Sequence, residues 1–275
     1  MKKTILLAII GVFLMGTNAF AVVGIDAYTV LMLHFDGDDG STDFMDSSFS
    51  NHTVTAHGNA QIDTAESKFG GASGLFDGYA DYLTVSDSDD WYFNEDFTID
   101  FWTKFNALPT GASSYVIGSQ LTGIPGHQWE LYFHEGPGIH RFRLYVVKNN
   151  TSYFVVNSDY ESYSVDTWYH IALTRNDDWY KIFIDGMQDI APTYNTFVWE
   201  NYAANLQIGS WGATYPEYAL NGWLDEFRIS KGIARWTSDF TPPTSEYEVI
   251  PESSSLILLG LGLLGTGIFK RKVKS

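Results

Sequence analysis

Apolar and polar residues alternate with a period of two along many short segments of this 275-residue chain. Residues 97–105 show the pattern well, because an extended strand places the apolar set on one face and the rest on the other: Phe97, Ile99, Phe101 and Phe105 against Thr98, Asp100, Trp102 and Lys104. Turn-forming residues separate such segments, and no run follows the helical period. The pattern predicts an all-β fold, a two-sheet antiparallel sandwich.

Further strands are expected in eight other segments, at residues 28–35, 82–85, 128–134, 141–147, 168–175, 180–185, 206–209 and 220–229. In the third and fourth of these, the more apolar set is expected to face the core: Trp129, Leu131, Phe133, Phe142, Leu144 and Val146. Many short strands at regular spacing fit one sandwich domain. We therefore place a single domain at residues 22–250.

The first 21 residues have the layout of a secretory signal peptide. Lys2 and Lys3 precede an apolar run, and the segment ends in small residues at Asn18-Ala19-Phe20-Ala21, a form typical of a cleavage site. The chain contains no cysteine, so an exported domain would depend on its core or on bound metal rather than on disulfides.

The last 25 residues, 251–275, carry a second hydrophobic signal. An uncharged run at 256–269 follows Pro251 and Glu252 and precedes the basic residues Lys270, Arg271 and Lys272. The run is short against the ~20 residues of a stable span. The segment resembles the PEP-CTERM sorting signal, with Ser253 in place of the second proline, which implies transient inner-membrane insertion and processing by an exosortase-like enzyme. A plain C-terminal anchor is the alternative.

Charge excludes one class of partner. The formal net charge is -17, and six of the 16 cationic residues but only one of the 33 anionic residues lie in the two end segments, which leaves the domain near -22. Phosphate backbones would be repelled by such a surface, so no nucleic acid is expected as a partner.

Several short motifs follow one another along the domain: Leu33-His34-Phe35-Asp36-Gly37, Lys68-Phe69-Gly70-Gly71, Phe76-Asp77-Gly78, Trp168-Tyr169-His170, Phe183-Ile184-Asp185-Gly186 and Leu224-Asp225-Glu226-Phe227-Arg228. In this order they resemble the LamG-like jelly rolls of the concanavalin A-like lectin/glucanase superfamily, of the laminin G and pentraxin type. The resemblance implies a jelly-roll sandwich. This fold carries lectins, adhesion modules and glycanases, so function has to be argued from faces and loops.

The outward-facing set of three strands combines aromatic and charged side chains. If these strands are neighbours, we expect them to form a carbohydrate-binding face with the residues Asp100, Trp102, Glu130, Tyr132, Arg143 and Tyr145. Aromatic rings stack on sugar rings while polar groups bond to hydroxyls. The alternative is an ordinary solvated face on which Glu130 and Arg143 pair across strands.

Asp100 and Glu130 raise the alternative of a glycoside hydrolase or lyase, since glycosidases use two carboxylates. Glycanases of this superfamily commonly carry several acidic residues at alternating positions of one strand, whereas residues 129–135 have only Glu130 and Glu135. No zinc, phosphate-binding or nucleophile-elbow motif is present either. The chain is therefore predicted not to be an enzyme.

Calcium is the one cofactor expected, as a structural ion. An aspartate-rich loop after the first strand includes Asp36 and Asp46, and oxygen ligands of this kind suit calcium. The family resemblance adds Asp225 as a ligand. The alternative is that these aspartates only form turns.

Together these observations predict an exported, non-catalytic domain at the cell surface or in the extracellular matrix of a Gram-negative bacterium. Its partner is expected to be an extracellular polysaccharide, a surface glycan or another matrix component. A purely structural matrix protein without a ligand is a further alternative.

Overall fold

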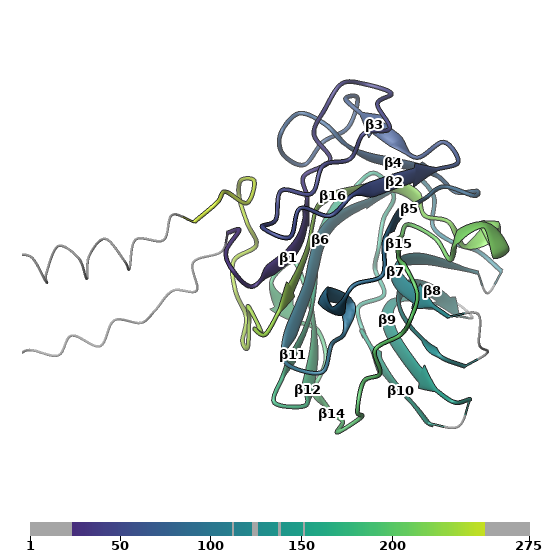
Figure 1. Cartoon of the computed structure of the whole chain (residues 1–275). Helices are drawn as coiled ribbons and strands as arrows, with labels where there is room; N and C mark the ends of the chain where they lie inside the picture. The colour runs from purple at the N-terminus through teal and green to yellow at the C-terminus, as the bar shows by residue number, and fades with distance from the viewer. Residues whose placement is uncertain (1–23, 112, 123–125, 137–138, 151, 251–275) are drawn as a thin grey trace, which may run out of the picture.

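The computed structural model describes residues 24–111, 113–122, 126–136, 139–150 and 152–250. Two antiparallel β-sheets stack face to face, so the predicted all-β sandwich is confirmed (Figure 1). Within these ranges there is no α-helix, and the three helical turns are short 3₁₀ elements: η1 Asp89–Trp91, η2 Gly212–Thr214 and η3 Pro216–Tyr218.

The nine-stranded sheet has the order β13-β12-β11-β6-β16-β4-β3, with β1 paired to β16 and β14 paired to β12. Its strands are β1 Thr29–Leu33, β3 Gln61–Asp63, β4 Ser73–Asp77, β6 Phe97–Phe105, β11 Trp168–Asn176, β12 Trp179–Ile184, β13 Met187–Gln188, β14 Thr193–Tyr194 and β16 Asn221–Lys231.

The seven-stranded sheet has the order β10-β9-β8-β7-β15-β5-β2. Its strands are β2 Val54–His57, β5 Tyr82–Val85, β7 Ser114–Leu121, β8 Gln128–Gly136, β9 Ile139–Lys148, β10 Ser152–Asn157 and β15 Leu206–Ile208. Every predicted strand is present in one of the two sheets, with ends that shift by one or a few residues.

The core between the sheets confirms the predicted inward set. On β8 and β9 the antiparallel register pairs these side chains directly, and all are completely buried: Trp129 with Val146, Leu131 with Leu144 and Phe133 with Phe142. From the opposite sheet, Phe105 stacks on Phe133 with ring centroids 4.4 Å apart. The pleat has therefore sorted apolar from polar residues as the alternation indicates.

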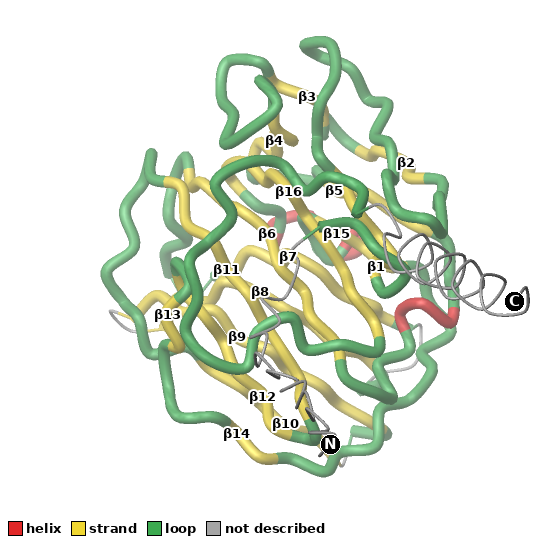
Figure 2. The backbone as a smooth tube through the Cα atoms, turned by 90° about the vertical axis from the view of Figure 1, so that its left-hand side faces the viewer, coloured by secondary structure: helices red, strands yellow, loops and turns green. Residues whose placement is uncertain are grey.

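The outer face of the nine-stranded sheet is covered, which the alternation does not indicate. All nine residues of β6 are buried, and Figure 2 looks onto this face, where loops cross in front of the strands. The two ends of the described region lie together here, because the Ile25 amide donates to Glu248 and the Ile250 amide donates back to Ile25, each at 2.9 Å. Outward-facing residues of β6 are thus not exposed to solvent.

The predicted signal peptide and the sorting residues Pro251, Glu252, Lys270, Arg271 and Lys272 lie outside the described residues. Among the helices within the described ranges, none is long and apolar enough to cross a membrane.

Candidate functional site

A pocket of about 370 Å³ opens on the outer face of the seven-stranded sheet. Most of its lining comes from β7 to β10, which lie on the side of the sandwich opposite β1 (Figure 1). Its lining combines rings with hydrogen-bonding groups: Ser114, Gln128, Glu130, Tyr132, His134, Arg143, Tyr145, Val155, Trp211 and Tyr218.

Strands β8 and β9 place the centre of the pocket by their register. Tyr132 lies opposite Arg143, and Glu130 lies opposite Tyr145. Because the core residues occupy the alternate positions, these four side chains must point outward together. The structure therefore brings together four of the six residues that we predicted for carbohydrate binding.

One wall of the pocket comes from the loop that follows β15. Gly209 starts this loop with φ at 89°, and a Cβ there would lie 2.4 Å from the ring of Phe76, so only glycine suits the position. The loop then carries Trp211 and Tyr218, whose rings pack against each other with centroids 4.5 Å apart. Two rigid aromatic surfaces thus stand beside the polar strand residues.

Among the described residues that line the pocket, Glu130 alone carries a carboxyl group. Its side chain accepts a hydrogen bond from Gln128. Burial raises the pKa of Glu130 to about 7, and the nearby Gln128 and Trp211 only partly offset this rise. The indole N–H of Trp211 is buried and makes no hydrogen bond of normal length to a described residue. The pocket thus holds a carboxyl group that is largely neutral at mildly acidic pH, with the Trp211 indole N–H directed toward it.

Arg143 is held by two neutral partners. Its Nε donates to Asn157 Oδ1 at 2.7 Å and its Nη1 donates to the hydroxyl of Tyr132 at 3.2 Å. None of the ion pairs in the described part of the chain joins Arg143 to Glu130. The alternative of a simple cross-strand pair between these two residues is therefore not what the structure shows.

His134 completes the polar side of the pocket. Its Nδ1 lies 3.1 Å from the hydroxyl oxygen of Ser114. Burial, with the positive charges of Arg143 and Arg141, lowers the pKa of His134, so this ring is neutral at pH 7.

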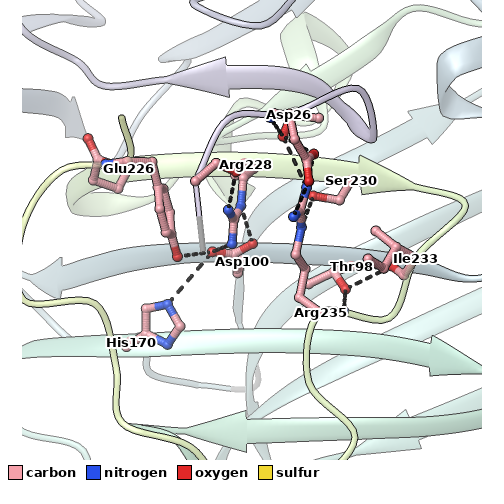
Figure 3. Close-up of polar contacts among 12 residues, drawn as sticks. Asp26, Thr98, Asp100, His170, Glu226, Arg228, Ser230, Ile233 and Arg235 are labelled. Atoms are coloured by element: carbon pink, nitrogen blue, oxygen red, sulfur yellow. Dashed lines mark hydrogen bonds and ion pairs between the residues drawn. The ribbon is translucent and has the colours of Figure 1, made fainter. Parts of the chain in front are cut away.

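Asp100 is not part of this face, which corrects our expectation. It lies on β6 in the other sheet and is completely buried (Figure 3). Arg228 donates to both of its oxygens, at 3.0 and 3.2 Å, and the hydroxyl of Tyr247 donates to it at 2.6 Å. Burial raises the pKa of Asp100, but Arg228 and the nearby His170 outweigh that effect and hold it below its usual value. Asp100 ties the C-terminal segment to the sheet.

Trp102, two residues further along β6, is also outside the pocket. It is buried, and the ammonium group of Lys68 lies 3.8 Å from its ring centroid. The assumption that β6 neighbours β8 and β9 was wrong, because β6 lies between β11 and β16 in the opposite sheet.

Asp46 has no capacity left for a metal ion. Oδ1 accepts hydrogen bonds from the amides of Met32 and Ser48, and Oδ2 accepts from the Ser48 hydroxyl and the His52 amide. This carboxylate organises a turn, as in the alternative reading of the aspartate-rich loop.

Asp225 and Asp36 suit a metal ion better than Asp46 does. Asp225 Oδ2 accepts from the amides of Lys68 and Phe69, while Oδ1 is buried without a partner among the described residues. Burial raises the pKa of Asp225 to about 8, and the charges of Glu226 and Asp36 add to the rise. Still, no group of three or more histidine or carboxylate side chains in the described region is placed to hold a metal. Any ion here would need backbone carbonyls as well.

The sequence analysis missed Trp211 and Tyr218, which stand about 80 residues further along the chain than Glu130 and Tyr132. The signal that could have found them is the cluster of aromatic residues and glycines at 209–218, which is rich for a loop.

Solved structures with the same fold include two instructive cases. The binding domain of botulinum neurotoxin serotype G matches with a TM-score of 0.57 and 14% identity, covering 75% of this chain and 49% of that one. Domain 4 of AbnA, an extracellular arabinanase from Geobacillus stearothermophilus that was solved with arabinotriose, matches with a TM-score of 0.56 and 19% identity, covering 78% and 96%. The chain thus spans about half of the neurotoxin domain and nearly all of the arabinanase domain.

No curated protein sequence matches this chain. A family profile described as the concanavalin A-like lectin/glucanases superfamily matches residues 77–235, more than half of the chain. This stretch includes β8, β9 and the loop after β15, which supply most of the pocket. The chain belongs to the concanavalin A-like lectin/glucanases superfamily.

Proposed function

We propose that this protein is a non-catalytic, carbohydrate-binding domain and that the pocket over β8 and β9 is its binding site. The observation that carries the proposal is the combination found there. Two loop aromatics, Trp211 and Tyr218, stand beside Tyr132, Tyr145 and Arg143 in one cavity on an otherwise acidic molecule.

The physical chemistry of the pocket suits a sugar. A volume of about 370 Å³ falls in the range of small-ligand sites and accommodates a short oligosaccharide end. Aromatic rings offer apolar surface for the C–H face of a sugar, while the Arg143 guanidinium and the Glu130 carboxyl offer partners for hydroxyl groups.

The comparisons support binding rather than catalysis. The neurotoxin neighbours are described as binding domains, and the arabinanase domain was solved with an oligosaccharide bound. A glycosidase needs two carboxyl groups about 5 to 10 Å apart across the scissile bond, whereas the described lining of this pocket supplies one, that of Glu130.

Affinity measurements on a panel of extracellular polysaccharides test the proposal. Trp211→Ala is expected to weaken binding about 10-fold, because it removes the aromatic surface on which a sugar ring would stack. Trp179→Ala is the matched control, since Trp179 is 45% exposed on β12 in the other sheet. Failure of the wild-type protein to bind any polysaccharide, with or without calcium, would refute the proposed function.

A glycoside hydrolase or lyase is the competing assignment. It requires release of new reducing or unsaturated ends from a polysaccharide, and it requires that Glu130→Gln abolishes this release. A structural matrix protein without a ligand requires that neither activity nor binding is found.

We further propose that the protein is exported and acts at the cell surface or in the extracellular matrix, with a tail that an exosortase-like enzyme processes. The support is the layout of residues 1–21 and 251–275, in which a signal-like start and a short apolar run with a basic end enclose the folded domain.

Calcium remains a proposal for the region of Asp36 and Asp225. The unpaired, buried Oδ1 of Asp225 supports it, as do the raised pKa values of both carboxyls, which burial causes first and nearby carboxylates increase, since a divalent ion would offset both effects. Asp46 is left out of this ligand set because its oxygens already bond to the backbone.

A further inference from the structure

Arg143 differs from the other arginines of the described region. Arg141, Arg175, Arg228 and Arg235 each lie within 3.7 Å of a carboxylate oxygen. Arg143 takes part in none of the ion pairs of that region, although the domain has about three carboxylates for every cation. In so acidic a chain, an arginine without a carboxylate partner distinguishes this pocket from the rest of the described surface.

The guanidinium of Arg143 is nevertheless fixed in orientation. Asn157 accepts from Nε and Tyr132 accepts from Nη1, at 2.7 and 3.2 Å, and Nη2 makes no hydrogen bond to a described residue. Both partners are neutral, so they position the group without compensating its charge. A planar guanidinium held in this way presents its remaining N–H groups to a ligand as a fork, the geometry that binds carboxylates and other oxyanions.

The other side chains of the pocket add little negative charge that would repel an anion bound to Arg143. Burial favours the neutral form of Glu130 up to about pH 7, and His134 is neutral because its pKa is lowered. Tyr132 and Tyr145, the ionisable groups that face Glu130 from β8 and β9, have raised pKa values and stay neutral as well. From β7 and the loop after β15, Glu130 meets Ser119 and Trp211, which do not ionise in this range. Arg143 therefore dominates the charge of the cavity.

We infer that the glycan bound in this pocket carries an anionic group, a uronate carboxylate or a sulfate ester, and that Arg143 binds that group. This inference rests on the proposed function and names its ligand class. The acidic surface elsewhere does not prevent such binding, because at about 0.15 M salt charges more than ~8 Å away are largely screened, whereas a direct contact with Arg143 is not.

Matched polysaccharide pairs test the inference on the purified full-length protein. Polygalacturonate is compared with its carboxyl-reduced product, and dextran sulfate is compared with dextran, at 0.15 M salt and pH 6. We expect the anionic member of one pair to bind at least 10-fold more tightly than its neutral partner. The pair that shows the preference distinguishes carboxylate from sulfate.

Two variants on the same face of the same strand separate a specific contact from overall charge. Arg143→Gln is expected to reduce affinity for the anionic member about 10- to 100-fold and to leave the neutral member unchanged, as for loss of hydrogen bonds to a charged group. Arg141→Gln removes the same charge, but Arg141 pairs with Glu161 and does not line the pocket, so it should have little effect. The thermal melting point of each variant shows that it is folded.

A pH series adds a readout that a structural role of Arg143 would not produce. Affinity for the anionic glycan should fall as pH rises through about 7, because Glu130 then becomes negative in the same cavity. Glu130→Gln should remove that dependence between pH 6.5 and 8.5.

The outcomes distinguish the inference from the function beneath it. Equal affinity for neutral and anionic members, or an equal loss for both in Arg143→Gln, would overturn the anionic ligand and leave carbohydrate binding intact. A neutral glycan found as the ligand in a wider panel would do the same. Absence of binding to any polysaccharide would remove the proposed function itself.

Discussion

Glu130→Gln provides a quantitative test of the pocket in the absence of any ligand. The folded protein raises the pKa of Glu130 from the ordinary 4.5 to about 7 by burial. Each pKa unit corresponds to about 1.4 kcal/mol, so the ionised side chain costs the folded state about 3 kcal/mol. Glu130 is only 3% exposed, so screening by solvent reduces this figure little.

The sign follows from proton binding. Between pH 4.5 and about 7 the folded chain holds a proton on Glu130 that the unfolded chain has released, so this residue makes stability fall as pH rises. Below pH 4.5 both states are protonated and the cost vanishes, and above pH 7 the full cost applies. Glutamine keeps the shape without the titration, so the variant should match the wild type near pH 4.5 and exceed its stability at pH 8.

Urea unfolding of both proteins at pH 4.5, 6, 7 and 8 measures the effect. The free-energy difference between variant and wild type should grow by about 3 kcal/mol across the series, or roughly 6 to 12 °C in melting point. Taking the difference cancels other titrating groups. Glu217→Gln, at an exposed position of η3, serves as the control for replacing a glutamate by glutamine outside the pocket. A difference that does not change with pH for Glu130→Gln would refute the buried, uncompensated carboxyl on which the description of the pocket rests.

Three further predictions concern the rest of the molecule. Tyr247→Phe removes a donor to buried Asp100 and should lower the free energy of unfolding by about 1 to 3 kcal/mol, and Asp100→Asn, which leaves Arg228 uncompensated, by about 3 to 5 kcal/mol, both measured in urea. Millimolar calcium should raise the melting point of the wild type, because an ion present at 100 times its Kd adds about 2.7 kcal/mol to the free energy of unfolding. Magnesium should raise it less, and Asp225→Asn should abolish the shift. If calcium leaves the melting point of the wild type unchanged, the aspartates act only as turn formers. The intact mass of the protein secreted by its native host should correspond to a chain that ends near Glu252. An intact C-terminal peptide would contradict processing.

Part of the candidate site could be predicted because strand periodicity is a local property. Once 128–134 and 141–147 alternate, the pleat alone requires Glu130, Tyr132, Arg143 and Tyr145 to point away from Trp129 and the other core residues. Only residues 137 and 138 separate β8 from β9 in the sequence, and strands so close along the chain commonly pair directly, so this pairing could be expected as well.

Applied to β6, the alternation rule predicted correctly which residues point away from the core, but not that other segments of the chain cover them. Asp100 and Trp102 do point away from the core, but the segments that contain Tyr247 and Lys68 lie over them, and these are distant along the chain. Alternation states which side of a sheet a residue occupies. It does not indicate whether another part of the chain covers that side.

Sequence alone therefore determined the all-β class, the inward residues and the outward face of β8 and β9. Tertiary structure alone decided that β6 belongs to the opposite sheet, that the loop after β15 brings Trp211 to Glu130, and that Arg143 meets Asn157 and Tyr132 instead of a carboxylate. The physical reason is range: the pleat acts between neighbouring residues, whereas burial, charge compensation and pKa depend on groups that only the packed fold brings together.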